Sequence, residues 1–179
     1  MLRTISIYGL IAGLIVAVPM NILMLLFPHG EGVSAYLSGY TLMLVGLSFI
    51  FVAVKRYRDR ALGGVIKFLP AFLIGLGISV VAGIIYVIAW EISLAMTNYT
   101  FMNDYVAAAI AAERAKGLPS AQLNAFIAEM EQMKTMYANP LFRLPMTFIE
   151  IFPVGLIVSL IAALLLRNSR FLPARSAIA

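Results

Sequence analysis

"FLPAFLIGLGISVVAGIIYVIAWEISLAM", residues 68–96, is a long run of mostly apolar residues with one charged side chain, Glu91. A helix needs about 20 such residues to cross the hydrocarbon core of a bilayer, so this run predicts a membrane-spanning helix. Further apolar runs lie at about 5–27, 37–54 and 144–166. The sequence therefore predicts an all-α fold: a four-transmembrane-helix bundle that makes residues 1–179 a single integral membrane domain.

The composition supports a membrane protein. Of the 179 residues, 63% are hydrophobic and only 12% are charged, whereas roughly a quarter of residues are charged in a soluble domain. The first run is too long for a secretory signal, whose apolar core has about 7 to 15 residues, so we expect a retained helix. The chain has no cysteine, which excludes disulfides, thiolate metal sites and a cysteine nucleophile.

The basic residues predict how the chain is oriented. Of the thirteen, nine fall on one side of the predicted spans: Arg3, Lys55, Arg56, Arg58, Arg60, Lys67, Arg167, Arg170 and Arg175. By the positive-inside rule, both termini and the 55–67 loop are expected in the cytoplasm. This position explains the net charge of +5, so we expect no nucleic-acid partner. The block Lys55, Arg56, Arg58 and Arg60 is expected to fix topology, with contact to membrane lipid headgroups as an alternative role.

Between the third and fourth spans, residues 99–138 predict an outward amphipathic helical hairpin. Apolar side chains recur there at helical spacing. On the first helix they are Phe101, Met102, Tyr105, Val106, Ala109 and Ile110; on the second they are Leu123, Phe126, Ile127, Met130, Met133 or Lys134, and Tyr137. We expect these faces to pack on each other, on the bundle, or on the membrane surface.

Two patterns have a simple packing interpretation beside a more specific one. Gly9 and Gly13 form a GxxxG spacing that serves a dimer face in some membrane proteins, but close packing within one bundle explains it as well. Met130, Met133 and Met136 offer thioether sulfurs that favour Cu(I), yet methionine is also a common filler of apolar helix faces. We expect packing in both cases, and the sequence predicts no metal and no cofactor.

"FIEIFPVGL", residues 148–156, places Glu150 inside the last apolar run. A charged residue within a span costs about 2.5–3.5 kcal/mol and usually faces the bundle interior or water. At 1.5 Å per residue, Glu150 and Glu91 both lie roughly 8–10 Å below the outer ends of their helices. Asn21 falls at a similar depth, so an intramembrane polar layer is predicted there.

The prolines and Arg143 belong to the same prediction. Pro19 and Pro153 are expected to kink their helices and to free a carbonyl group, which is tolerated in a membrane only where protein or water covers it. Two neighbouring carboxylates cannot both ionise cheaply unless a cation lies between them, and Arg143 can supply that cation. A buried hydrogen-bonded network that fixes helix register is the alternative to a transport site.

Six segments together resemble a known family. They are "FIFVAVKRYRD", "LGGVIKF", "YVIAWEI", "FMNDYVA", "MYANPLF" and "FIEIFPVGLIVSLIAALLLR". In this order they resemble the small bacterial four-span membrane proteins of the domain-of-unknown-function 4199 family, over about residues 5–167. The resemblance implies a bacterial inner-membrane protein with an outward helical insertion before the last span, and it brings no assigned activity.

Three functions are compatible with the sequence. A non-enzymatic accessory or scaffold protein, forming a homo-oligomer or joining a larger membrane complex, needs nothing that the sequence lacks. A small proton- or cation-coupled transporter or channel would use Glu91 and Glu150 as coupling acids. A membrane enzyme is the least favoured, because the sequence has no nucleophile motif, His-rich metal motif or Gly-rich phosphate loop.

Overall fold

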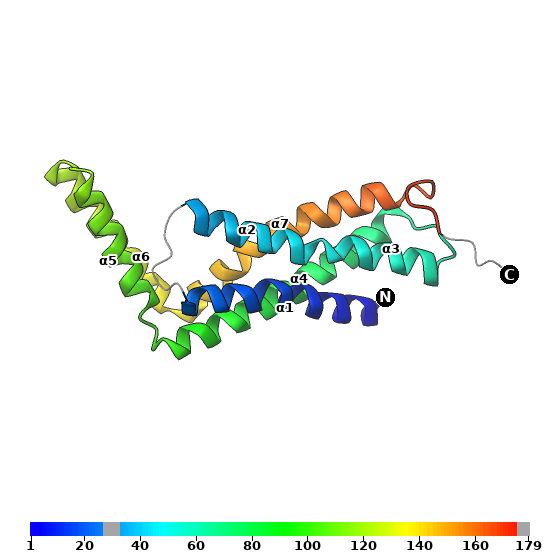
Figure 1. Ribbon diagram of the computed structural model, residues 1–179, viewed down its shortest axis with the longest axis horizontal. Coiled ribbons are helices and arrows are strands. Elements are labelled where there is room, and N and C mark those ends of the chain that lie inside the picture. Colours follow the sequence, from blue (N-terminus) through cyan, green and yellow to red (C-terminus); the bar gives the residue numbers. More distant parts are fainter. Residues whose placement is uncertain (27–32, 175–179) are drawn as a thin grey trace. The chain divides into compact units, whose positions relative to one another are not determined.

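The protein is built from helices, and the computed structural model describes its residues 1–26 and 33–174. The described residues contain no strand, which confirms the predicted all-α fold. In chain order the helices are α1 (Leu2–Leu26), α2 (Val33–Leu47), α3 (Phe49–Ala61), α4 (Phe68–Met96), α5 (Phe101–Ala115), α6 (Ser120–Ala138) and α7 (Pro140–Leu166) (Figure 1).

Four stretches are long and apolar enough to cross a membrane, as predicted: Leu2–Leu23, Leu37–Ala61, Phe68–Met96 and Pro140–Leu166. The second combines α2 and α3, which Ser48 separates; its hydroxyl donates to the Val45 carbonyl at 2.6 Å. Helix α3 continues through the basic block to Ala61, because Lys and Arg are good helix formers although they end an apolar pattern. The expected loop therefore begins at residue 62. The predicted end of the first span, residue 27, lies outside the described residues.

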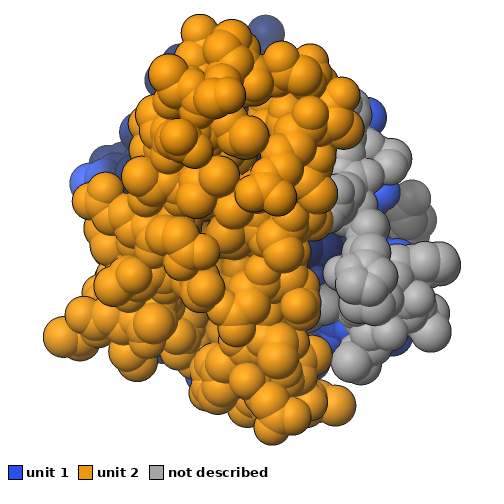
Figure 2. All heavy atoms as spheres, turned by 90° about the vertical axis from the view of Figure 1, so that its left-hand side faces the viewer, with its two compact units in different colours: residues 1–89, 148–179 blue, residues 90–147 orange. Residues whose placement is uncertain are grey.

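The chain forms two compact units (Figure 2). Unit 1 contains residues 1–89 and 148–179, and unit 2 contains residues 90–147. Helices α4 and α7 each contribute to both units, since the boundaries fall inside them. Unit 1 holds most of the membrane-spanning length and the main apolar core, whereas unit 2 holds the helical hairpin.

Small residues bring the helices of unit 1 together. Gly9 and Gly13 of α1 face α4, where an added Cβ would come within 2.5 Å of Val81 and 2.8 Å of Ile85. The GxxxG spacing therefore serves close packing inside one chain, as predicted.

Helices α4 and α7 meet through a reciprocal contact. Gly75 of α4 lies against Ser159 of α7, and Gly155 of α7 lies against Ser79 of α4. The two hydroxyls are 3.2 Å apart, and each also donates to the carbonyl of the glycine four residues earlier in its own helix. Both buried serines are thus hydrogen-bonded, and each lies against a glycine of the other helix.

In unit 2, α5 and α6 lie side by side as a hairpin (Figure 1). Gly117 ends α5 with φ of +73°, a conformation that glycine adopts at low cost. The half-buried residues of α6 match the predicted apolar face, while the rest of that helix is exposed: Leu123, Phe126, Ile127, Met130, Met133, Lys134 and Tyr137. On α5, Met102 and Val106 are buried but Tyr105 is exposed.

The connection between α6 and α7 is stabilised by the residues next to it. Asn139 accepts a hydrogen bond from the Leu141 backbone N–H at 3.0 Å through its side-chain oxygen, and Pro140 occupies the first helical position. Both choices are typical of a helix start. They place Arg143 in the first turns of α7.

Candidate functional site

Glu150 is a carboxylate in the interior of α7, within the membrane-spanning part of unit 1. Its Oε2 accepts a hydrogen bond from the Tyr86 hydroxyl of α4 at 3.1 Å. Tyr86 is 3% exposed and belongs to the core, whereas Glu150 is exposed on the side of α7. Its neighbours Ile149 and Pro153 are exposed as well. The Glu150 carboxylate therefore lies among exposed apolar residues on the surface of α7.

Asn21 and Tyr86 lie at nearly the same level of unit 1 as Glu150. Counting from the end of unit 1 where α1 begins and α7 ends, the three residues are roughly 24–29 Å along their helices at 1.5 Å per residue. Asn21 donates its side-chain N–H to the Ala17 carbonyl, 2.8 Å away in its own helix. Unit 1 thus has a polar level, but Asn21 serves its own backbone there. Glu91 belongs to unit 2, so the level that it was expected to share with Glu150 stays a prediction.

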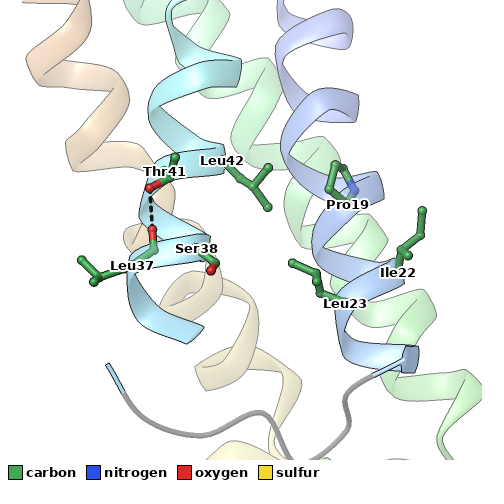
Figure 3. A pocket seen from close by; sticks show the side chains of 7 residues that line it. All are labelled: Pro19, Ile22, Leu23, Leu37, Ser38, Thr41 and Leu42. Atoms are coloured by element: carbon green, nitrogen blue, oxygen red, sulfur yellow. Dashed lines mark hydrogen bonds between the residues drawn. The ribbon is translucent and has the colours of Figure 1, made fainter. Parts of the chain in front are cut away.

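An open groove lies between α1 and α2 in the same unit (Figure 3). It has a volume of about 560 Å³ and is lined by Pro19, Ile22, Leu23, Leu37, Ser38, Thr41 and Leu42. The Thr41 hydroxyl donates to the Leu37 carbonyl at 2.6 Å. Pro19, predicted as a kink residue, therefore forms part of a mostly apolar wall.

Unit 2 contains a buried ion pair that joins α4 to α7. Arg143 donates from Nε to Oε1 of Glu91 at 2.7 Å and from Nη2 to Oε2 at 2.8 Å. Its Nη1 donates to the Tyr137 carbonyl at 3.1 Å. The Arg143 side chain is 6% exposed and that of Glu91 is 26% exposed. Arg143 thus neutralises Glu91 in a two-bond geometry, the strongest form of a carboxylate contact.

Aromatic rings complete this cluster. The Arg143 guanidinium lies 5.3 Å from the ring centroid of Tyr99 and 5.7 Å from that of Tyr137, within the range of a cation–π interaction. Tyr99 has φ of +57°, a backbone conformation that costs about 1 kcal/mol or more for a non-glycine residue. Trp90 donates its indole N–H to the Tyr137 hydroxyl at 2.7 Å. The strained backbone of the turn after α4 is therefore stabilised by the contact between the Tyr99 ring and Arg143.

The sequence did not identify Tyr99, Tyr137 and Trp90 as parts of this cluster. Tyr137 was placed on the apolar face of α6, which is correct, but its hydroxyl and its carbonyl both serve polar contacts. The spacing of aromatic residues near a span's end indicates an interfacial position, and that signal is present in Trp90 and Tyr99. It does not say which ring meets which cation.

The structure divides the basic block at the end of α3. Arg58 is wholly buried, whereas Arg56 and Arg60 are exposed and Lys55 is half-buried. Lys55 pairs with Asp59, and Arg56 donates to the Tyr8 hydroxyl at 3.2 Å. Any contact with lipid headgroups in this block must therefore come from residues other than Arg58.

Arg58 holds the chain that follows α7. Its side chain donates to Oδ1 of Asp59 at 2.7 Å and to the carbonyls of Leu166 at 3.3 Å, Phe171 at 3.0 Å, and Leu172. Arg175, the last basic residue, lies outside the described residues. A buried arginine with four acceptors is a structural tie between two chain segments.

In the described part of the chain, no cluster of three or more His, Cys, Asp or Glu side chains could hold a metal ion. Met130 and Met133 are half-buried on α6, and Met136 is exposed. Four membrane-spanning helices and a helical hairpin define a multi-pass helical membrane protein.

Within that class, residues 7–168 match the family model described as "Protein of unknown function (DUF4199)". The match covers most of the chain, so the chain belongs to this family. No curated protein matches the chain, and no solved structure does either.

Proposed function

We propose that the protein is a non-enzymatic membrane scaffold that associates with copies of itself or joins a larger membrane complex through the exposed side of α7. One observation carries this proposal: Glu150 is exposed in the interior of a membrane-spanning helix. A carboxylate facing hydrocarbon costs about 2.5–3.5 kcal/mol, so such residues are normally covered by protein or water. Tyr86 occupies one carboxylate oxygen and leaves the other for a group on a neighbouring protein.

The surroundings of Glu150 suit such an interface. Ile149 and Ile157 are 63% and 59% exposed, and Leu160 is 43% exposed. They line the same helix as Glu150, and in a membrane interhelical hydrogen bonds together with close packing drive association. A partner that offers a hydrogen-bond donor opposite Glu150 would satisfy the carboxylate and bury this surface.

Co-purification of two differently tagged copies from native membranes in mild detergent tests the proposal. The wild type should retain the second copy or a partner in fixed stoichiometry. Glu150→Leu should lower that retention several-fold, whereas Glu150→Gln, which still donates and accepts hydrogen bonds, should keep most of it. Glu129→Gln, an exposed position on α6, is the matched control. A monomer without partner, or full retention by Glu150→Leu, contradicts the proposal.

A second candidate is a small transporter or channel that uses Glu150 as a coupling acid. The common level of Asn21, Tyr86 and Glu150 in unit 1 favours it. Glu91 suits that role poorly, because Arg143 engages both of its oxygens. Proton or cation flux into liposomes, measured for wild type, Glu150→Gln and Glu91→Gln, tests it. Absence of flux in the wild type, or flux unchanged by Glu150→Gln, rules this candidate out.

We also propose that the protein lies in a bacterial inner membrane with both termini in the cytoplasm and the hairpin outside. Support comes from the basic residues at the end of unit 1 where α1 begins and α7 ends. Because the chain has no cysteine, Ser169→Cys and Ala121→Cys each introduce one thiol. A membrane-impermeant maleimide should label the second variant but not the first in intact cells; the reverse pattern contradicts this orientation.

A further inference from the structure

The chain that follows α7 folds back against the end of α3, as Figure 1 shows for its red segment. Arg58 fixes it by donating to two of its backbone carbonyls, those of Phe171 and Leu172, and to the carbonyl of Leu166 at the end of α7. Phe171 also contacts Phe51 edge to face, at 6.1 Å between ring centroids. We call residues 167–172 the C-terminal hook. It is a fixed surface, because a wholly buried guanidinium and an aromatic contact both hold it.

The hook carries two arginines in addition to the residues that Arg58 holds. Arg167 and Arg170 are exposed, and neither forms an ion pair within the described part of the chain. The carboxylate nearest in this region, Asp59, is already engaged by Arg58 and Lys55. Among the described residues, no carboxylate therefore compensates the charges of the hook.

Further exposed cations surround the same end of unit 1, and they also have no ion pair among the described residues: Arg3, Arg56, Arg60 and Lys67. Each Lys or Arg close to an anionic bilayer surface strengthens binding about fivefold, an attraction that screening confines to within a Debye length. The fold thus gathers positive charge at one end of unit 1, and the part of the chain that the structure describes forms no ion pair with these cations.

Apolar side chains stand beside these cations. On the hook Phe171 and Leu172 are 36% and 47% exposed, and in the turn before α4 Leu62 and Val65 are 42% and 62% exposed. A soluble anion would gain nothing from such neighbours, whereas a phospholipid presents an anionic headgroup and acyl chains together. Cations at the level of the phosphates with apolar groups just below them match that arrangement.

We propose that the C-terminal hook is a binding site for a phospholipid with an anionic headgroup, in which Arg167 and Arg170 contact the phosphate. This site is independent of the exposed face of α7, so its failure would leave the scaffold proposal standing. Arg58 acts here as a positioning residue, because it holds the hook in place and is itself wholly buried.

Native mass spectrometry of the full chain in detergent tests this site, with phosphatidylglycerol and phosphatidylcholine of identical acyl chains as probes. The wild type should retain phosphatidylglycerol preferentially. Arg167→Gln with Arg170→Gln should lower its retention roughly thirtyfold, about fivefold for each lost cation, and leave phosphatidylcholine unchanged. Arg114→Gln with Lys134→Gln removes two cations from the hairpin and should have no effect. Hydrogen exchange of residues 49–61 confirms that the variants are folded.

Three results overturn the proposal. The wild type retains the two lipids equally, or the hairpin variant loses as much phosphatidylglycerol as the hook variant, which would indicate a response to total charge. In the third, glycerol 1-phosphate displaces the lipid from the wild type at the concentration of the bound lipid, which would indicate a soluble anion site.

Discussion

Arg58 connects the end of α3 to the chain around the end of α7 in unit 1, and Arg143 connects α7 to α4 in unit 2. Both side chains are buried, and both form hydrogen bonds between segments that are far apart in the sequence, but their acceptors differ. Arg58 donates mainly to backbone carbonyls and shares Asp59 with Lys55. Arg143 engages both oxygens of Glu91, a carboxylate for which the described residues offer no second cation. The comparison teaches that the cost of losing an arginine depends on what its removal leaves behind.

The largest effect is expected for Arg143→Met. This change leaves Glu91 charged and mostly buried, and breaking such a pair costs about 3–5 kcal/mol; we expect about 3 kcal/mol, since the Glu91 side chain is 26% exposed. Hydrogen exchange in lipid nanodiscs should show lost protection in residues 99–139 and little change in residues 37–61.

The combination of Arg143→Met with Glu91→Gln sharpens this test. If the stranded charge causes the loss, the double variant should be more stable than Arg143→Met alone, because Gln needs no counter-charge. A double-mutant cycle reads this coupling directly. Additive effects of the two changes would contradict the assigned pair.

A smaller effect is expected for Arg58→Met. The side chain forms hydrogen bonds with several carbonyls, and charged hydrogen bonds contribute about 1.5–3 kcal/mol. Asp59 keeps Lys55 as a partner, and the exposed hook lets water reach the freed carbonyls, so we expect about 2 kcal/mol. Lost protection should be confined to residues 166–173. If Arg58→Met loses as much stability as Arg143→Met, the stranded carboxylate does not explain the difference between the two arginines.

The sequence predicted the architecture well because hydropathy and helical spacing act locally. The order of residues predicts the four spans, the hairpin and the half-buried face of α6, from Leu123 to Tyr137, without any long-range contact. It also predicted that Gly9 and Gly13 pack within the chain. Each of these features follows from the order of side chains along one helix.

The partners of charged residues were harder to predict. Counting along helices gives the depth of a residue but not the direction that it faces relative to other helices. The sequence therefore allows Arg143 a position between two carboxylates. In the structure it engages Glu91, 52 residues earlier in the chain. Arg58 was grouped with its basic neighbours, yet it continues the buried stripe of Ile50 and Val54 at intervals of four. That spacing was a signal that could have revealed its burial.

The smallest effect on stability is expected at the glycine–serine contact between α4 and α7, where no ion pair contributes. Gly155→Ala would place a Cβ 2.5 Å from Ser79 Oγ. Overpacking of this kind costs roughly 1–3 kcal/mol, and the better helix propensity of alanine returns up to about 1 kcal/mol, so a net loss of about 1 kcal/mol is expected. Gly39→Ala is the matched control, because its Cβ would meet Met20 at an ordinary 3.6 Å.

Thermal unfolding in one detergent compares the two variants. Gly155→Ala should unfold at a lower temperature than the wild type, and Gly39→Ala at an equal or higher one. Adding Ser79→Ala to Gly155→Ala removes the hydroxyl oxygen that the new methyl group meets, so it should recover part of the loss. If it recovers nothing, the loss arises elsewhere along α7 and the reciprocal glycine–serine contact does not set the approach of α4 and α7. If Gly39→Ala is as damaging as Gly155→Ala, helix glycines in unit 1 are needed for a reason other than close contact.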